Sequence, residues 1–202
     1  QQARPEVRLP SPELKRQQDE GAEFYKRGQF GEALAISERV LAQTRSEFGP
    51  DHEQVSIQAI GLGYVAEAAG RFDVAEPAYR EAVRVGELAY GKDSAGATQS
   101  LEHLANVLVR LGRAAEAEPM LKRVLAIRSG IVGADHSYNA SAHAGLGAAS
   151  LARGDSTQAL ASYRQAVRLL TERRETQTLA AHVMQNEIRR QVTAFSGLAE
   201  AA

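Results

Sequence analysis

The sequence predicts an all-α solenoid, a stack of helix pairs, and three sets of evenly spaced small residues carry this prediction. Glycine recurs every 42 residues, at Gly28, Gly70, Gly112 and Gly154. Alanine recurs at the same step, at Ala33, Ala75, Ala117 and Ala159. Seven positions before each of these glycines stands a small residue: Gly21, Gly63, Ala105 and Gly147. A fixed period of this length is the signature of stacked copies of one supersecondary unit.

The third copy of the period contains two apolar stripes with helical spacing. Over 94–111, apolar residues recur at steps of three and four, and Gly112 follows with a backbone that is free to turn. The second stripe covers about 115–131 and ends before a turn at 133–135. We therefore expect each copy to be two helices joined by a glycine turn, followed by a second glycine turn into the next copy.

The turns between copies place an aspartate two positions after a glycine. They read Gly49-Pro50-Asp51, Gly91-Lys92-Asp93 and Gly133-Ala134-Asp135. Aspartate is a preferred N-cap residue, so we expect each of these aspartates to cap the next helix. His52 and His136 follow two of them, and we expect structural roles for both because the regular repeat accounts for their positions.

The small residues of the first helices predict close packing. Gly63, Ala105 and Gly147 fall on the apolar stripe of their helices. Glycine inside a helix costs roughly 0.5–1 kcal/mol relative to alanine, so its recurrence indicates that a contact compensates for this cost. We expect a neighbouring helix to approach closely at these positions.

The order of a small residue, glycine, alanine and a large residue resembles the tetratricopeptide repeat (TPR), a helix–turn–helix unit. That unit is normally about 34 residues long, whereas the period here is 42. The long form, with the turns GPDH at 49–52 and GADH at 133–136, resembles the repeats of kinesin light chains. It is also similar to bacterial arrays that often precede caspase-like (CHAT) protease domains or other effectors. The resemblance implies a right-handed α-solenoid whose first helices line a concave, partner-binding face.

The periodicity divides the chain into three parts. Residues 1–12 are rich in proline and charge, and we expect a flexible N-terminal lead-in. Residues 13–174 are expected to hold the array of about four TPR helix pairs. The expected bounds of the repeats are about 13–50, 51–92, 93–134 and 135–174.

Residues 175–202 follow the last regular repeat. Met184, Ile188, Val192 and Phe195 recur at steps of four, four and three, which predicts one more amphipathic helix. We expect this helix to cap the array or to join it to a further domain. Its apolar stripe is also a candidate surface for self-association, so a homo-oligomer is an open alternative.

Composition and motifs argue against several function classes. The net charge of −1 over 202 residues gives no electrostatic case for nucleic acid or an anionic membrane. The sequence has no cysteine, which excludes thiolate metal sites and a cysteine nucleophile from this segment. It contains no P-loop, G-x-S-x-G or H-E-x-x-H motif. We therefore expect a non-catalytic protein without cofactor or metal, and without membrane insertion.

The compartment is not predicted. The chain begins at Gln1 rather than methionine, which fits a trimmed domain as well as a protein whose secretory signal was removed. Both the cytoplasm and a periplasmic or secreted location therefore remain open.

Each first helix carries a second stripe beside its core stripe. In the first three copies this stripe mixes apolar with amide and charged side chains: Tyr25, Lys26, Ile57, Ile60, Tyr64, Glu67, Gln99, Glu102, Asn106, Val109 and Arg110. An apolar floor with a few polar clamps suits an extended or helical peptide. We expect these residues to line a partner-binding groove. The alternative is that a neighbouring helix of a tightly wound array covers Ile57 and Ile60.

These observations favour a protein-interaction scaffold, expected to be the sensor or adaptor part of a larger bacterial protein. The alternative function is a structural module that self-associates through its C-terminal helix. An all-helical enzyme or small-ligand receptor has no supporting motif.

Overall fold

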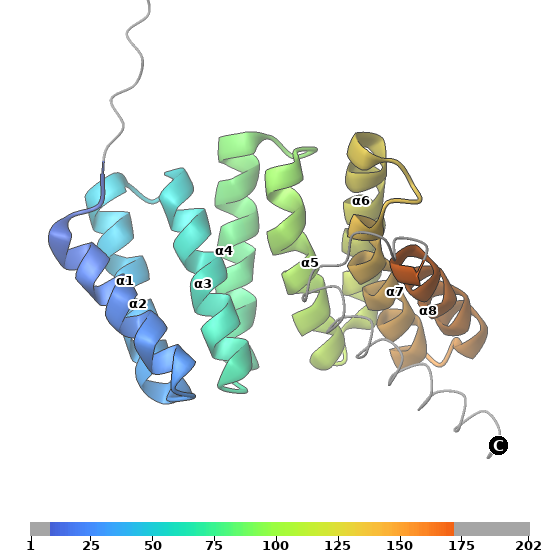
Figure 1. Cartoon of the computed structure of the whole chain (residues 1–202), viewed down its shortest axis with the longest axis horizontal. Coiled ribbons are helices and arrows are strands. Elements are labelled where there is room, and N and C mark those ends of the chain that lie inside the picture. The colour runs from blue at the N-terminus through green and yellow to red at the C-terminus, as the bar shows by residue number, and fades with distance from the viewer. Residues whose placement is uncertain (1–8, 172–202) are drawn as a thin grey trace, which may run out of the picture. The chain divides into compact units, whose positions relative to one another are not determined.

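The computed structural model describes residues 9–171, which form eight α-helices, one 3-10 helix and no strand. The helices are α1 (Pro12–Lys26), α2 (Phe30–Phe48), α3 (Glu53–Ala68), α4 (Phe72–Tyr90), α5 (Ala95–Arg110), α6 (Ala114–Val132), η1 (Ser137–Asn139), α7 (Ala140–Ala152) and α8 (Ser156–Thr171) (Figure 1). The predicted all-α class and the four helix pairs are confirmed. The further helix expected at 175–202 lies outside the described residues.

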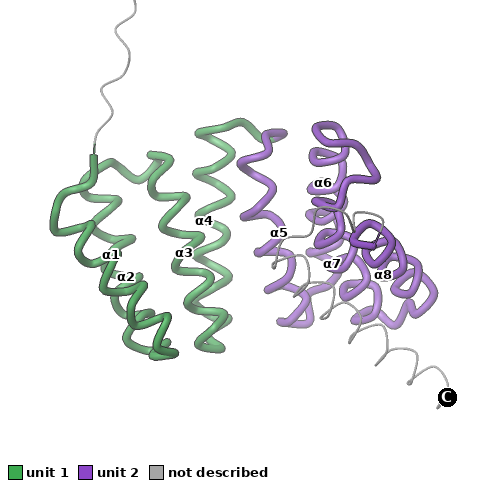
Figure 2. The backbone as a smooth tube through the Cα atoms, viewed as in Figure 1, with its two compact units in different colours: residues 1–92 green, residues 93–202 purple. Residues whose placement is uncertain are grey.

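The chain divides into two compact units (Figure 2). Unit 1, residues 1–92, contains α1 to α4, and unit 2, residues 93–202, contains α5 to α8. Within each unit, every helix packs against the next one in the chain. The division coincides with the boundary that the period predicts between the second and third repeats.

The helix pairs are joined by glycines in the left-handed region of backbone conformation. Gly28 has a φ of 73° and Gly112 a φ of 76°. Side chains other than glycine rarely adopt this conformation, so glycine recurs wherever the first helix must end and the second must begin. The predicted role of the evenly spaced glycines as helix ends is therefore confirmed.

The turns between repeats differ from the prediction in which residue caps the next helix. His52 is the N-cap of α3, and its Nδ1 accepts a hydrogen bond of 3.2 Å from the backbone N–H of Gln54. His136 does the same for η1 by accepting from Tyr138 at 3.1 Å. The two histidines therefore have structural roles, as expected. The prediction that the aspartates cap the next helices is wrong for these two turns, and it is also wrong for the turn at 91–93, where Ser94 is the N-cap of α5.

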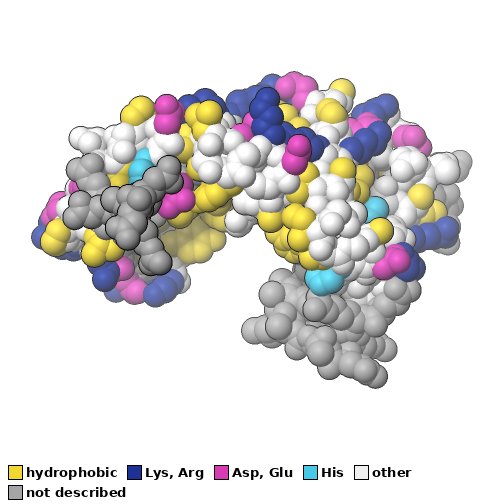
Figure 3. Space-filling view, turned by 90° about the horizontal axis from the view of Figure 1, so that it is seen from above, with side chains coloured by type: hydrophobic (Ala, Val, Ile, Leu, Met, Phe, Trp, Pro, Cys, Tyr) yellow, Lys and Arg dark blue, Asp and Glu magenta, His cyan; other side chains and the backbone are white. Residues whose placement is uncertain are grey.

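The aspartates of the same two turns form ion pairs instead. Asp51 binds Arg84 of α4, and Asp135 binds Arg168 of α8. Each pair ties the turn that opens a repeat to the second helix of that repeat. On the face shown in Figure 3, basic and acidic side chains lie interspersed.

The core of each helix pair depends on the small residues. In α3, a Cβ added at Gly63 would lie 2.5 Å from the ring of Tyr79, which is fully buried in α4. In α7, a Cβ at Gly147 would lie 2.8 Å from the ring of Tyr163. The close approach predicted at these positions is therefore confirmed, and it is a tyrosine of the paired helix that fills the space.

Unit 2 also contains a buried ion pair between its first two helices. Glu102 of α5 accepts a hydrogen bond of 2.6 Å from Arg128 of α6, and their side chains are 9% and 2% exposed. The guanidinium also donates to the Tyr138 carbonyl and the Ser141 hydroxyl, each at 3.2 Å. It lies over the Tyr138 ring, 4.1 Å from the ring centroid. A buried charge is tolerated only when it is paired and its remaining donors form hydrogen bonds, as they do here.

The first prediction concerns the glycines of α3. We expect Gly63→Ala to lower the free energy of unfolding by about 1–3 kcal/mol, because the new methyl overlaps the Tyr79 ring. Gly61 is the matched control, since a Cβ there meets nothing within 4 Å. Gly61→Ala should raise stability by about 0.5–1 kcal/mol through helix propensity alone. Urea unfolding measures both changes, and equal effects of the two substitutions would contradict the packing.

The second prediction concerns the buried ion pair. Glu102→Leu leaves the Arg128 charge buried without its carboxylate, and we expect a loss of about 3 kcal/mol or more. Adding Arg128→Met should restore most of this loss, because two apolar side chains need no partner. Chemical denaturation of the two single variants and the double variant checks this coupling. A loss below about 1 kcal/mol for Glu102→Leu would show that the pair is not buried in solution.

Candidate partner-binding site

Unit 1 contains a pocket of about 410 Å³ formed by its first three helices. The α1 residues of its wall are Gln17, Gln18, Gly21, Ala22, Tyr25 and Lys26. The α2 and α3 residues are Ile36, Ser37 and Val40, and Gln58, Gly61, Leu62, Tyr64 and Val65. The wall is mostly apolar and also includes amide, phenol and ammonium side chains.

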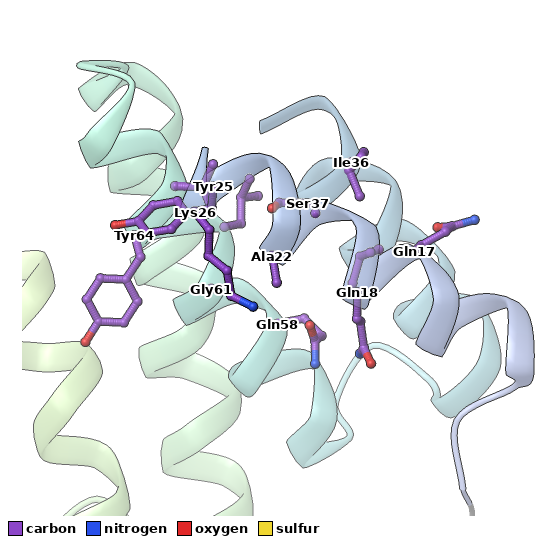
Figure 4. A pocket seen from close by; sticks show the side chains of 14 residues that line it. Gln17, Gln18, Ala22, Tyr25, Lys26, Ile36, Ser37, Gln58, Gly61 and Tyr64 are labelled. Carbon is purple, nitrogen blue, oxygen red and sulfur yellow. The ribbon is translucent and has the colours of Figure 1, made fainter. Parts of the chain in front are cut away.

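Helical spacing explains how these side chains converge. Gln18, Ala22 and Tyr25 are four and three positions apart, so they share one face of α1. Gln58, Gly61 and Val65 follow the same rule in α3. Figure 4 shows Tyr25 and Tyr64 at one end of the pocket and Gln18 toward the other, with Ala22, Gly61 and Gln58 between them.

Three of the predicted groove residues line the pocket, namely Tyr25, Lys26 and Tyr64. The predicted residues Ile57 and Ile60 belong to the same helix but are not part of its wall. Ile57 is 47% exposed, whereas Ile60 is half-buried. Ile60 is therefore partly covered, whereas Ile57 is open to solvent.

The tyrosine end of the pocket is fixed by a second layer of aromatic rings. Tyr64 packs edge-on against Tyr79, with 6.2 Å between ring centroids, and Tyr25 packs edge-on against Phe30 at 5.4 Å. Tyr79 donates its hydroxyl to Glu67 at 2.6 Å. Burial, followed by this hydrogen bond to a carboxylate, raises the pKa of Tyr79. Tyr79 therefore stays neutral, and its ring packs against the Tyr64 ring and limits its movement.

Two acidic residues of the predicted groove have internal partners. Glu67 accepts the hydrogen bond from Tyr79, and Glu102 is buried against Arg128. The expectation that Glu102 lies on an open stripe is wrong, because its partner comes from the following helix, 26 positions along the chain. Its carboxylate neutralises a buried charge and is not presented to solvent.

The remaining predicted groove residues belong to unit 2 and differ in exposure. Gln99 and Arg110 are exposed, whereas Asn106 and Val109 are half-buried. The Asn106 Oδ1 lies 3.0 Å from where a Cβ on Gly145 would stand. Asn106 therefore packs against α7 and fills space in its own unit.

The sequence interpretation missed Gln17, Gln58 and Gly61 among the wall residues. Gly61 carried the available signal, because it is a glycine inside a helix, where glycine lowers stability. The structure shows no packing neighbour that would require glycine there. Gln17 donates to Glu13 at 2.9 Å, and its Oε1 is buried without a hydrogen-bond partner in the described part of the chain.

The charge at the pocket belongs to Lys26. Its ammonium lies 2.8 Å from Glu23, one turn earlier on the exposed face of α1. The hydrogen bond and charge of Glu23 raise the pKa of Lys26, and those of Lys26 lower the pKa of Glu23. Both groups are solvated, so the pair orients the Lys26 ammonium while leaving it exposed to solvent.

Residues 9–171 provide neither a metal site nor a membrane-spanning helix. No group of three or more His, Asp or Glu side chains there could hold a metal ion. His143 is partly buried, and this burial, followed by the charge of Arg168, lowers its pKa. No helix in the same range has the length and apolar character needed to cross a membrane.

The family model described as tetratricopeptide repeat matches residues 22–87 and 95–172. No sequence among curated proteins matches the chain. Solved structures do share its fold. BtubC (BKLC) from P. vanneervenii is 21% identical with a TM-score of 0.71, over 86% of this chain and 70% of that one.

Two further solved structures span nearly the whole chain. One is a Q17M variant of kinesin-light-chain TPR-like repeats from Podosopora anserina, 18% identical with a TM-score of 0.71, covering 96% of this chain and all (100%) of that one. The other is MamA, from residue 41 to its end, of Desulfovibrio magneticus RS-1. It is 16% identical with a TM-score of 0.60, over 95% of this chain and 92% of that one. With two matched segments that together cover more than half of its length, the chain belongs to the tetratricopeptide repeat family.

Proposed function

We propose that this protein-interaction scaffold binds a peptide segment of a partner protein in the pocket of unit 1. The observation that carries the proposal is a formed, mostly apolar pocket of about 410 Å³ whose wall also includes tyrosine and glutamine side chains. Protein sites for small ligands have volumes of about 300–1,000 Å³ and combine apolar walls with a few polar groups.

The chemistry of the wall favours a peptide over a charged small molecule. The apolar residues Ile36, Val40 and Leu62 offer a surface for a side chain, and Gln18 and Gln58 offer amide donors and acceptors for a backbone. The tyrosines lose little conformational freedom on binding because aromatic neighbours already hold them. Tyrosine is also over-represented among residues that dominate binding energy.

The wider role that we propose is that of a sensor or adaptor within a larger bacterial protein. In this role the pocket of unit 1 is the site that recognises the partner. This proposal rests on the resemblance of the long repeats to arrays that precede effector domains. Self-association through Met184, Ile188, Val192 and Phe195 is the alternative, and it stays a prediction of the sequence because these residues lie outside the described range.

The third prediction tests the peptide site. A random 12-residue peptide library displayed on phage is selected on the full chain, and the recovered peptides are synthesised for calorimetry. We expect Tyr64→Ala to weaken binding of these peptides by about tenfold or more, because it removes a ring fixed at the pocket end.

The control for this experiment is Leu88→Ala, which removes a side chain that is 63% exposed in the same unit but outside the pocket wall. This variant should bind as the wild type does. Peptides that bind equally well to Tyr64→Ala, or a selection that recovers no peptide, would contradict the proposed site.

A further inference from the structure

The two units are built on the same period, and their comparison shows why unit 1 has this pocket. Ala22, Ser37 and Gly61 of the pocket wall correspond, two periods later, to Asn106, Leu121 and Gly145. The helices that carry them correspond as well, since α2 and α6 begin at Phe30 and Ala114, also two periods apart.

In unit 2, side chains of the chain itself fill the space next to Gly145. A Cβ on Gly145 would lie 2.8 Å from Cδ2 of Leu121 and 3.0 Å from Oδ1 of Asn106. Leu121 is fully buried. A leucine side chain with an amide group beside it therefore occupies this position in the third and fourth repeats, and α5 and α7 contact each other directly.

In unit 1, the same position is open. A Cβ on Gly61 would meet no atom within 4 Å. Ser37 has a shorter side chain than leucine, and its hydroxyl donates to the Ala33 carbonyl of its own helix at 2.9 Å. Ala22 lacks the side-chain amide that Asn106 has at the corresponding position of unit 2. All three of these small residues line the pocket.

Other positions of the wall are apolar in both units. Val40 and Leu62 of the pocket correspond to Val124 and Leu146, which are buried in unit 2. Gly21 of the wall corresponds to Ala105, so a small residue stands at this position of the first helix in both units. The space in unit 1 thus retains walls suited to a branched aliphatic group.

We infer that the pocket of unit 1 accepts a leucine side chain from a peptide segment of a partner protein, seated over Gly61 between Ser37 and Ala22. This inference rests on the proposed function and names the side chain that the site selects. The amides of Gln18 and Gln58, which stand among the wall residues, bind the peptide groups that flank this leucine, as the Asn106 amide stands beside Leu121 in unit 2.

The inference is tested by placing the leucine in the pocket from within the chain. The variant Ala22→Asn/Ser37→Leu copies the residues of unit 2 into unit 1, and Ser37→Ala is the matched control that keeps the pocket open. We expect the double variant to melt at a temperature several degrees above that of the wild type and of Ser37→Ala. A double variant that melts below both would overturn the leucine-shaped pocket, whatever the peptide experiments show.

The second arm uses the peptides recovered from the random library. We expect leucine at one fixed position, a loss of about tenfold or more in affinity when this leucine is replaced by alanine, and a similar loss on the double variant but not on Ser37→Ala. Peptides that depend on Tyr64 but tolerate alanine at every leucine would overturn the inference and leave the proposed function standing. A library that yields no Tyr64-dependent peptide would contradict the proposed function. The melting temperatures of the double variant and Ser37→Ala would still test whether a leucine side chain fits the pocket.

Discussion

The packing of Tyr79 against the bare backbone at Gly63 is the contact on which unit 1 depends. A side chain at Gly63 would overlap the ring, so α3 and α4 can approach only because glycine stands there. The same ring supports Tyr64 at the pocket and donates its hydroxyl to Glu67. One buried tyrosine therefore links the core of a helix pair to the surface where we propose that a partner binds.

The two units show how one repeat can produce either a filled interior or an open pocket. The spacing of helices and turns is the same in both, because it depends on glycines whose left-handed conformation ends each first helix. What differs is the size of a few side chains that face the space between successive first helices. Leu121 and Asn106 fill that space in unit 2, whereas Ser37 and Ala22 leave it open in unit 1.

The sequence predicted the elements that depend on local or strictly periodic signals. The helix pairs, their glycine turns and the close approach at Gly63 and Gly147 follow from spacing alone. The capping residues were predicted wrongly because Asp51 and Asp135 find arginines 33 positions later, which leaves the adjacent histidines to cap. Glu102 was misplaced for the same reason, since its partner Arg128 lies on another helix. The pocket depends on Ala22, Ser37 and Gly61, which come from three different helices and share a wall only in the folded chain. The sequence therefore identified the tyrosines at one end of the pocket but not these small residues.

The most direct test of this account uses the two corresponding glycines as reporters within one chain. A ¹⁵N-labelled full-length protein is titrated with a leucine-containing peptide from the library, and the amide signals of Gly61 and Gly145 are followed. The account predicts that the Gly61 signal shifts in proportion to occupancy while the Gly145 signal stays in place, because Leu121 already covers it. A shift of Gly145 equal to that of Gly61, or a saturated complex in which Gly61 does not move, would contradict it.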